Sequence, residues 1–338
     1  MKPPYEPALA HCAAAVAVSA LLLGLLLLLL DAEAGRIAAL LRALPWTLVL
    51  AVAAIEAVLL ITGALKWRLS VTWFRPDVGA PSLWRSIEAT GVGSLLAQVL
   101  PAQLATASAR VLMQRHHAGA GMAAFATFYE QLFDLLALSA VAAISAVLLL
   151  GAEPGLAAAT GALATLGSVL GSRLVFRLAG KVSDCLVRRA RRHAPWLESL
   201  PSALHDASRL PQRLAVALTV LSVLRIACLG TRAVLIFAVL TPAASPVGVA
   251  IAFPVVHLAT VLTAMPGAFG TMEWAWTGAL FAAGASAGDA AAAAIVFRVI
   301  AFSALMVVLA PVTVVLAMRL ALLITRRRAD RKLPDARV

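Results

Sequence analysis

Residues 86–138 decide the fold and read SIEATGVGSLLAQVLPAQLATASARVLMQRHHAGAGMAAFATFYEQLFDLLAL. Pro101 interrupts the first apolar part of this segment. Because proline donates no backbone hydrogen bond and disfavours helix in the residue before it, we predict a helix break here. The next helix carries Glu130 and Asp134 four residues apart and therefore on one face. An acidic residue in the middle of a membrane helix costs about 2.5–3.5 kcal/mol, so both carboxylates should face a partner or a wet cavity.

The same arrangement occurs a second time near the C-terminal end. Pro266-Gly267 interrupts another apolar segment, and charged residues follow it. The two interruptions align as PAQLAT at 101–106 and PGAFGT at 266–271, sharing the order Pro, small, any, apolar, small, Thr. The predicted structural breaks are therefore Pro101, Pro266, Gly267 and Gly270.

The composition identifies an integral membrane protein. Hydrophobic residues make up 62% of the 338 residues and charged residues 13%, with a mean hydropathy of +0.95; soluble domains have about 45–50% and about 25%. We predict a single membrane domain over residues 1–338. The net charge of +12 comes with no nucleic-acid recognition motif, so anionic lipid is the expected partner of the basic residues and nucleic acid is not. The three cysteines lack metal-ligand spacing, and no metal or cofactor is expected.

The order of apolar segments predicts an all-α polytopic fold with about six full transmembrane helices and two broken re-entrant hairpins. The six spans are predicted at residues 12–30, 45–65, 121–150, 155–172, 214–240 and 289–318, and the hairpins at 86–113 and 247–283. Lys66-Trp67-Arg68 should anchor the end of the second span at the membrane surface. In the alternative topology both broken segments cross fully, which would place Arg68, Arg75 and Arg85 outside.

Basic residues orient the chain. The loop at residues 173–213 has nine Lys or Arg against three acidic residues, and the tail at 319–338 is also basic. The positive-inside rule makes both segments cytoplasmic, so both termini should lie on the cytoplasmic side of a bacterial inner membrane. The run at 188–192 either only fixes topology or also binds anionic head groups.

Under this topology the chain divides into two repeats of opposite orientation. Residues 1–150 form the first repeat, and residues 151–318 form the second, which includes the basic loop. Inverted repeats with interrupted helices in corresponding positions predict a binding site near the midplane between the halves.

The charged residues inside apolar segments are the candidate site. The predicted substrate-binding residues are Arg110, Glu130, Asp134, Arg225, Arg232, Glu273 and Arg298. Arg110 or Arg298 is expected to pair with the carboxylates of residues 130 and 134, either as a head-group site or as a structural ion network. Arg225 and Arg232 bind a phosphate, snorkel to the membrane surface or pair with Glu56. Glu273 either caps a helix or takes part in gating or proton coupling.

These motifs resemble the membrane region of lysylphosphatidylglycerol synthases and the flippase-like proteins related to it. The resemblance spans roughly residues 40–318. It is carried by the runs GSLLAQVLPAQL at 93–104, RVL at 110–112, YEQLFDLLAL at 129–138, MPGAFGTME at 265–273 and FR at 297–298. The chain departs from the family pattern at Ala105 and Thr106, which replace glycines, and at Gln131, where an arginine is common. No synthase domain follows residue 318, so aminoacyl transfer is not expected.

The predicted function is flippase-like movement of a phospholipid or polyprenyl-linked head group through a midplane cavity. No zinc helix, phosphate loop or nucleophile elbow is present, so an enzyme is not expected and no catalytic residue is assigned. The alternatives are an accessory subunit or membrane transferase in envelope lipid or glycolipid biosynthesis, an ion-coupled small-molecule transporter, or a scaffold. Membrane lipids, anionic or lipid-linked, and envelope biosynthesis enzymes are the expected partners.

Overall fold

The computed structural model describes residues 34–151, 153–164, 211–263 and 265–330, with positions 21, 24, 25, 167 and 181, and contains no strand among them. Its elements are α2 (Ala34–Arg42), α3 (Trp46–Phe74), α4 (Leu83–Leu96), α5 (Ala102–Ala118), α6 (Ala120–Leu149), α9 (Gln212–Leu240), α10 (Pro246–Leu262), η2 (Pro266–Ala268), α11 (Thr271–Ala282) and α12 (Ala287–Asp330). A short apolar helix also covers Pro154–Ala164. The all-helical class is confirmed. Most of the predicted span at 12–30 and most of the loop at 173–213 lie outside the described residues.

Four helices are long and apolar enough to cross a membrane. They are α3, α6, α9 and the Ala287–Val315 part of α12, of 29 or 30 residues each. About 20 residues suffice for a span, so the chain is a multi-pass membrane protein. The expected end of the second span is wrong, because α3 continues through Lys66 to Phe74. Lys66 is fully buried and is no interfacial anchor.

Both apolar segments with internal prolines form pairs of shorter helices. The first pair, α4 and α5, is separated at residues 97–101, and the second, α10 and α11, at residues 263–270. Gly267 has φ +57°, and a Cβ there would lie 2.5 Å from the carbonyl oxygen of Gln98. Its N–H donates to the carbonyl oxygen of Leu100 at 3.4 Å. The two breaks, far apart in sequence, therefore touch through their backbones, which only a glycine permits.

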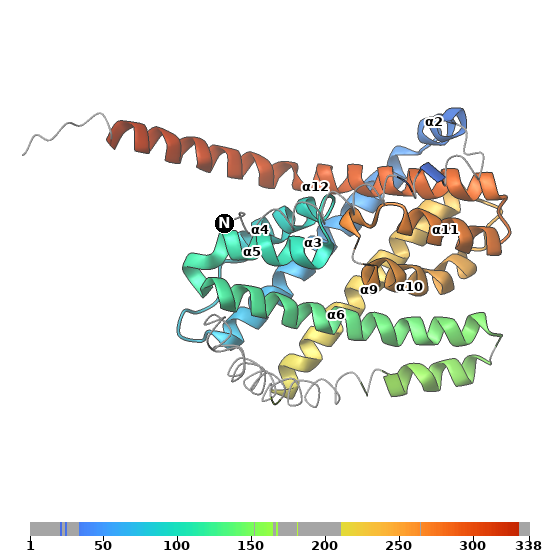
Figure 1. Ribbon diagram of the computed structural model, residues 1–338, viewed down its shortest axis with the longest axis horizontal. Helices are drawn as coiled ribbons and strands as arrows, with labels where there is room; N and C mark the ends of the chain where they lie inside the picture. Colours follow the sequence, from blue (N-terminus) through green and yellow to red (C-terminus); the bar gives the residue numbers. More distant parts are fainter. Residues whose placement is uncertain are drawn as a thin grey trace, which may run out of the picture.

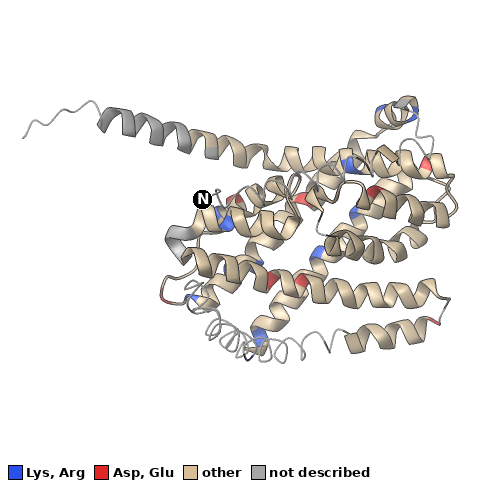
Figure 2. Ribbon diagram, in the orientation of Figure 1, with Lys and Arg blue, Asp and Glu red and all other residues tan. Residues whose placement is uncertain are grey.

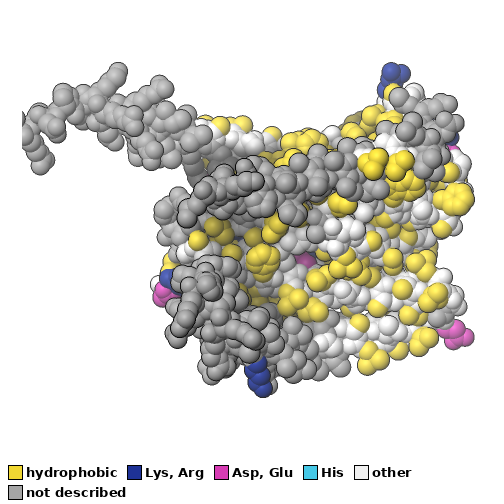
Figure 3. Space-filling model, in the orientation of Figure 1, with side chains coloured by type: hydrophobic (Ala, Val, Ile, Leu, Met, Phe, Trp, Pro, Cys, Tyr) yellow, Lys and Arg dark blue, Asp and Glu magenta, His cyan; other side chains and the backbone are white. Residues whose placement is uncertain are grey.

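The helices cross in three levels (Figure 1). In this view α12 runs along the top and α6 runs lower, above the short Pro154–Ala164 helix, while α3 and α9 run diagonally between α12 and α6 and contact each other. The α4–α5 pair lies to one side and the α10–α11 pair to the other. In Figure 3, hydrophobic side chains spread across the described part of the face, and most charged side chains lie at its edge. This distribution is what lipid contact requires.

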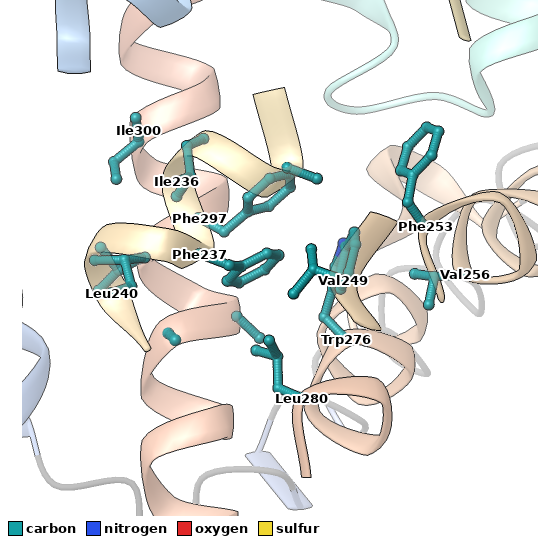
Figure 4. Close-up of a cluster of buried hydrophobic side chains, with 14 of the residues drawn as sticks. Ile236, Phe237, Leu240, Val249, Phe253, Val256, Trp276, Leu280, Phe297 and Ile300 are labelled. Carbon is teal, nitrogen blue, oxygen red and sulfur yellow. The ribbon is translucent and has the colours of Figure 1, made fainter. Parts of the chain in front are cut away.

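An aromatic cluster joins the C-terminal helices. Phe237 of α9 stacks on Phe297 of α12 with ring centroids 4.9 Å apart and lies 4.6 Å from the Trp276 ring of α11. Figure 4 shows these rings facing one another, with Leu280 and Val249 beside them. Between membrane helices, close packing of this kind supplies the association energy. It fixes α9, α11 and α12 around one wall of the site described next.

Candidate functional site

A polar cavity of about 310 Å³ lies between the four spans and the two breaks. Its lining includes Thr90, Ser94 and Gln98 of α4 and the turn after it, and Gly267 of the second break. Seven charged side chains line it: Glu56, Arg110, Glu130, Asp134, Arg225, Arg232 and Arg298. We call this space the charged cavity. Figure 2 shows charged positions part-way along α6 and α9, far from the helix ends.

Arg110 and Glu130 form the most deeply buried ion pair of the cavity wall. Their side chains are 1% and 4% exposed, and Arg110 Nη1 donates to Glu130 Oε1. Arg110 Nη2 also donates to Gly63 O and Thr90 Oγ1, both at 3.3 Å, and the guanidinium lies over the Trp67 ring. This pair ties α5 to α6 and explains how Glu130 is accommodated at membrane depth.

Asp134 pairs with a lysine that the sequence motifs did not include. Lys66 Nζ lies 2.5 Å from Asp134 Oδ1 and donates to the backbone oxygen of Glu130 at 3.1 Å. Arg225 Nε lies further from the same carboxylate, 3.8 Å from Oδ2. The sequence contained a signal for this pairing, because two carboxylates on one face of α6 need two cations nearby.

Arg232 of α9 donates to Glu56 of α3, so of the alternatives predicted for Arg232 the structure shows the ion pair. The Arg232 guanidinium lies over the Phe297 ring, with Cζ 5.5 Å from the ring centroid. The ion pair links a helix in the first half of the chain to a helix in the second half. Because both side chains of the Arg232–Glu56 ion pair are mostly buried, this pair also stabilises the packing of α3 against α9.

Arg298 and Glu273 hold the second break. Arg298 Nε donates to Glu273, Nη1 to Gly267 O at 2.7 Å and Nη2 to Ala268 O at 3.1 Å. Glu273 Oε2 in turn accepts the N–H of Gly270 at 2.8 Å, so it caps α11 and pairs with a cation at once. The planar guanidinium also stacks over Phe269, 4.2 Å from the ring centroid. A backbone break at membrane depth needs such partners for its carbonyl groups.

Four buried polar atoms in the cavity wall have no hydrogen-bond partner among the described residues. Two are donors, Nε of Arg110 and of Arg232, and two are acceptors, Oε2 of Glu130 and Oε1 of Gln131. Buried polar atoms nearly always find a partner, in protein or in ordered water. The cavity is therefore suited to water or to a polar ligand.

A second, mostly apolar cavity of about 450 Å³ shares one wall with the charged cavity. It lies between α5, α6, α9 and α10, and its apolar lining includes Leu135 and Leu138 of α6 and Val261 of α10. Arg225 and Asp134 line both spaces. We call this second space the apolar groove.

The structure thus brings together most of the residues predicted from sequence. Six of the seven line the charged cavity, and Glu273 touches it through Arg298. Sequence reasoning missed Lys66 and the apolar groove. Among the described residues, no three His, Cys, Asp or Glu side chains are grouped to hold a metal ion.

The fold and the cavity define a class: a helical multi-pass membrane protein with a charged cavity between interrupted helices. Residues 12–310 match the family described as lysylphosphatidylglycerol synthase TM region. The chain belongs to this family. Searches of curated proteins and of solved structures found no match to it.

Proposed function

We propose that this protein moves the head group of a phospholipid or polyprenyl-linked lipid between the leaflets of the bilayer, through the charged cavity. The observation that carries the proposal is the meeting of charged side chains from four candidate spans in one cavity beside two helix breaks. A head group crossing hydrocarbon loses its hydration, and fixed charges and dipoles at membrane depth replace part of it.

Residues of both helix breaks line the charged cavity. Their backbones touch at Gly267 and Leu100, and Arg298 holds the second break from α12. Interrupted helices in corresponding positions surround the substrate site in transporters built from inverted repeats. We propose that the α4–α5 and α10–α11 pairs are re-entrant hairpins, that the two halves are inverted repeats, and that alternating exposure of the cavity moves the head group.

The proposed location is a bacterial inner membrane with both termini cytoplasmic, as the basic loop and tail favour. The protein would act without catalysis and without a cofactor, by passive exchange or by coupling to an ion gradient. Envelope biosynthesis enzymes are proposed as possible suppliers or users of the lipid.

The test is leaflet exchange of fluorescent phospholipids and of a polyprenyl phosphate in liposomes holding the purified full chain, without nucleotide. Exchange above protein-free liposomes for at least one lipid supports the proposal. A proton or sodium gradient that accelerates uptake of a water-soluble solute, with no lipid exchange, favours a small-molecule transporter. A new lipid product formed by the purified chain favours a transferase.

A further inference from the structure

The charges around the cavity pair almost one to one. Each of the four carboxylates, of Glu56, Glu130, Asp134 and Glu273, has a cation in direct contact. Those cations belong to four residues: Arg232, Arg110, Lys66 and Arg298. Arg225 is a fifth cation, and its ion-pair contact within the described residues is 3.8 Å from a carboxylate that Lys66 already holds at 2.5 Å. This set therefore carries one surplus positive charge.

Arg225 is placed to receive a ligand. Its side chain is 29% exposed, while the arginine that pairs with Glu130 is 1% exposed. A Cβ on Gly63 would lie 2.5 Å from Arg225 Nη1, so the absence of a side chain on α3 makes room for the guanidinium. A guanidinium with free donors is the side chain best matched to phosphate oxygens.

The two spaces that meet at Arg225 differ in chemistry. On one side lies the charged cavity; on the other lies the apolar groove, whose wall contains Leu132, Leu135, Leu138 and Val261. A groove of this size at membrane depth suits a hydrocarbon chain, because most of its wall is apolar and would leave many groups of a polar occupant without partners. The ligand that fits both spaces is an amphiphile whose phosphate joins its polar and apolar parts.

From this juxtaposition we infer that Arg225 binds the phosphate of a lipid with one net negative charge, whose hydrocarbon chain lies in the apolar groove. The inference rests on the proposed function and specifies its substrate. It also predicts discrimination against zwitterionic lipids. Every carboxylate of the set described above already has a cation, so a lipid ammonium group finds no unpaired carboxylate there.

The test is a binding measurement, independent of transport. The purified full chain in detergent is titrated with dioctanoyl-phosphatidylglycerol, dioctanoyl-phosphatidylcholine, dioctanoylglycerol or glycerol 3-phosphate, and the bound fraction is counted by native mass spectrometry. We expect the anionic lipid to bind at least about tenfold tighter than the zwitterionic and uncharged lipids, and glycerol 3-phosphate to bind far more weakly than the anionic lipid.

Substitutions test separately the phosphate site at Arg225 and the apolar groove. Arg225→Gln should lower the affinity for the anionic lipid about tenfold or more and remove the preference, while Arg225→Lys should retain part of it. Leu135→Trp should weaken binding of all three lipids and leave their ranking unchanged. Arg213→Gln, at an exposed position on the same helix, should bind as the unmodified chain does. Gly63→Ala displaces the guanidinium sterically and serves as the second variant if Arg225→Gln does not fold.

Two outcomes overturn the inference: folded Arg225→Gln binding the anionic lipid as tightly as the unmodified chain, or glycerol 3-phosphate alone binding as tightly as the lipid. The second outcome would indicate a site for a free phosphate. Charge-dependent binding without leaflet exchange would leave the inference standing and refute the proposed function. Leaflet exchange by the Arg225→Gln variant, together with unchanged binding of the anionic lipid, would support the proposed function and refute the inference about Arg225.

Discussion

Lys66 Nζ lies 2.5 Å from Asp134 Oδ1, and its side chain is 1% exposed. The same ammonium group donates to the backbone oxygen of Glu130, so one side chain of α3 contacts the acidic face of α6 at two places. A buried carboxylate in a membrane helix is tolerated when a cation of this kind is in contact with it. The pair is therefore a structural condition for the charged cavity, and the predictions below begin with it.

Lys66→Met should destabilise the protein, by less than the roughly 3–5 kcal/mol lost when one partner of a fully buried ion pair is removed, because Asp134 is partly exposed and keeps one more distant cation. Thermal unfolding in detergent micelles measures the change. Arg68→Met is the matched control two residues along α3, where the side chain is half-buried, and it should shift the midpoint little. Equal shifts of the unfolding midpoint in the two variants would show that the Lys66–Asp134 ion pair does not stabilise the protein.

Gly267→Ala should destabilise the second break. The residue has φ +57°, which costs a residue with a Cβ about 1–2 kcal/mol, and the new Cβ would lie 2.5 Å from the Gln98 backbone oxygen. Gly278→Ala is the control, since nothing lies within 4 Å of its Cβ position in α11. There the exchange should be neutral or slightly stabilising in the same unfolding experiment. A neutral Gly267→Ala would mean that the breaks do not meet as described.

Arg298→Lys should not preserve the second break. The guanidinium donates to Gly267 O, Ala268 O and Glu273 from three different nitrogens. A lysine has a single tetrahedral ammonium nitrogen in place of this planar fork and cannot keep all three contacts. We expect a loss of roughly 2 kcal/mol or more in thermal unfolding, as for lost charge-assisted hydrogen bonds. Arg213→Lys, exposed on α9, provides the comparison and should be neutral. Equal stability of the Arg298→Lys and Arg213→Lys variants would contradict the claim that the three hydrogen bonds of Arg298 hold the second break.

The connection after α3 carries a pH-sensitive surface pair. Arg75 Nη2 lies 2.8 Å from Asp77 Oδ2, and this guanidinium lowers the pKa of the Asp77 carboxyl. A lowered carboxyl pKa stabilises the folded state above its ordinary value of about 3.9, and the contribution is lost as pH falls through the lower folded pKa. Asp77→Asn should therefore be slightly less stable than the unmodified chain at pH 6 and equal to it at acidic pH. Because the pair is exposed, the difference should be small and should shrink with added salt; a gap that widens on acidification would contradict the assignment.

Hydropathy and two prolines were enough to predict the helical class, both helix breaks and, among the six spans expected, the four long apolar helices that the described residues contain. The second break is the clearest case, because α11 begins at Thr271, directly after Gly270, the last of the predicted structural breaks. The charged residues were found for a physical reason: charge within an apolar segment is expensive and therefore visible in sequence. Their meeting in one cavity could be expected from that cost, although not their exact pairing.

Lys66 was misassigned because a Lys-Trp-Arg run at the end of an apolar segment has the composition of an interfacial anchor. The burial of its side chain against α6 shows that the residue lies inside the bundle. The apolar groove was missed for a different reason. Its leucines are indistinguishable in sequence from lipid-facing leucines, and only the packing of α6 against α10 sets them apart.

The most direct test of the charged cavity as a lipid pathway is leaflet exchange in liposomes, comparing the intact chain with Glu130→Gln and Arg298→Gln. Glu153→Gln, at an exposed position after α6, is the matched control. Unfolding midpoints in detergent establish which variants are folded. We predict that the intact chain and the control exchange lipid at the same rate, and that folded cavity variants exchange it at least about tenfold more slowly, as expected when about 1.4 kcal/mol of stabilisation is lost. Equal exchange by the intact chain and both folded cavity variants would place the pathway elsewhere, and no exchange of any lipid by the intact chain would contradict the proposed function itself.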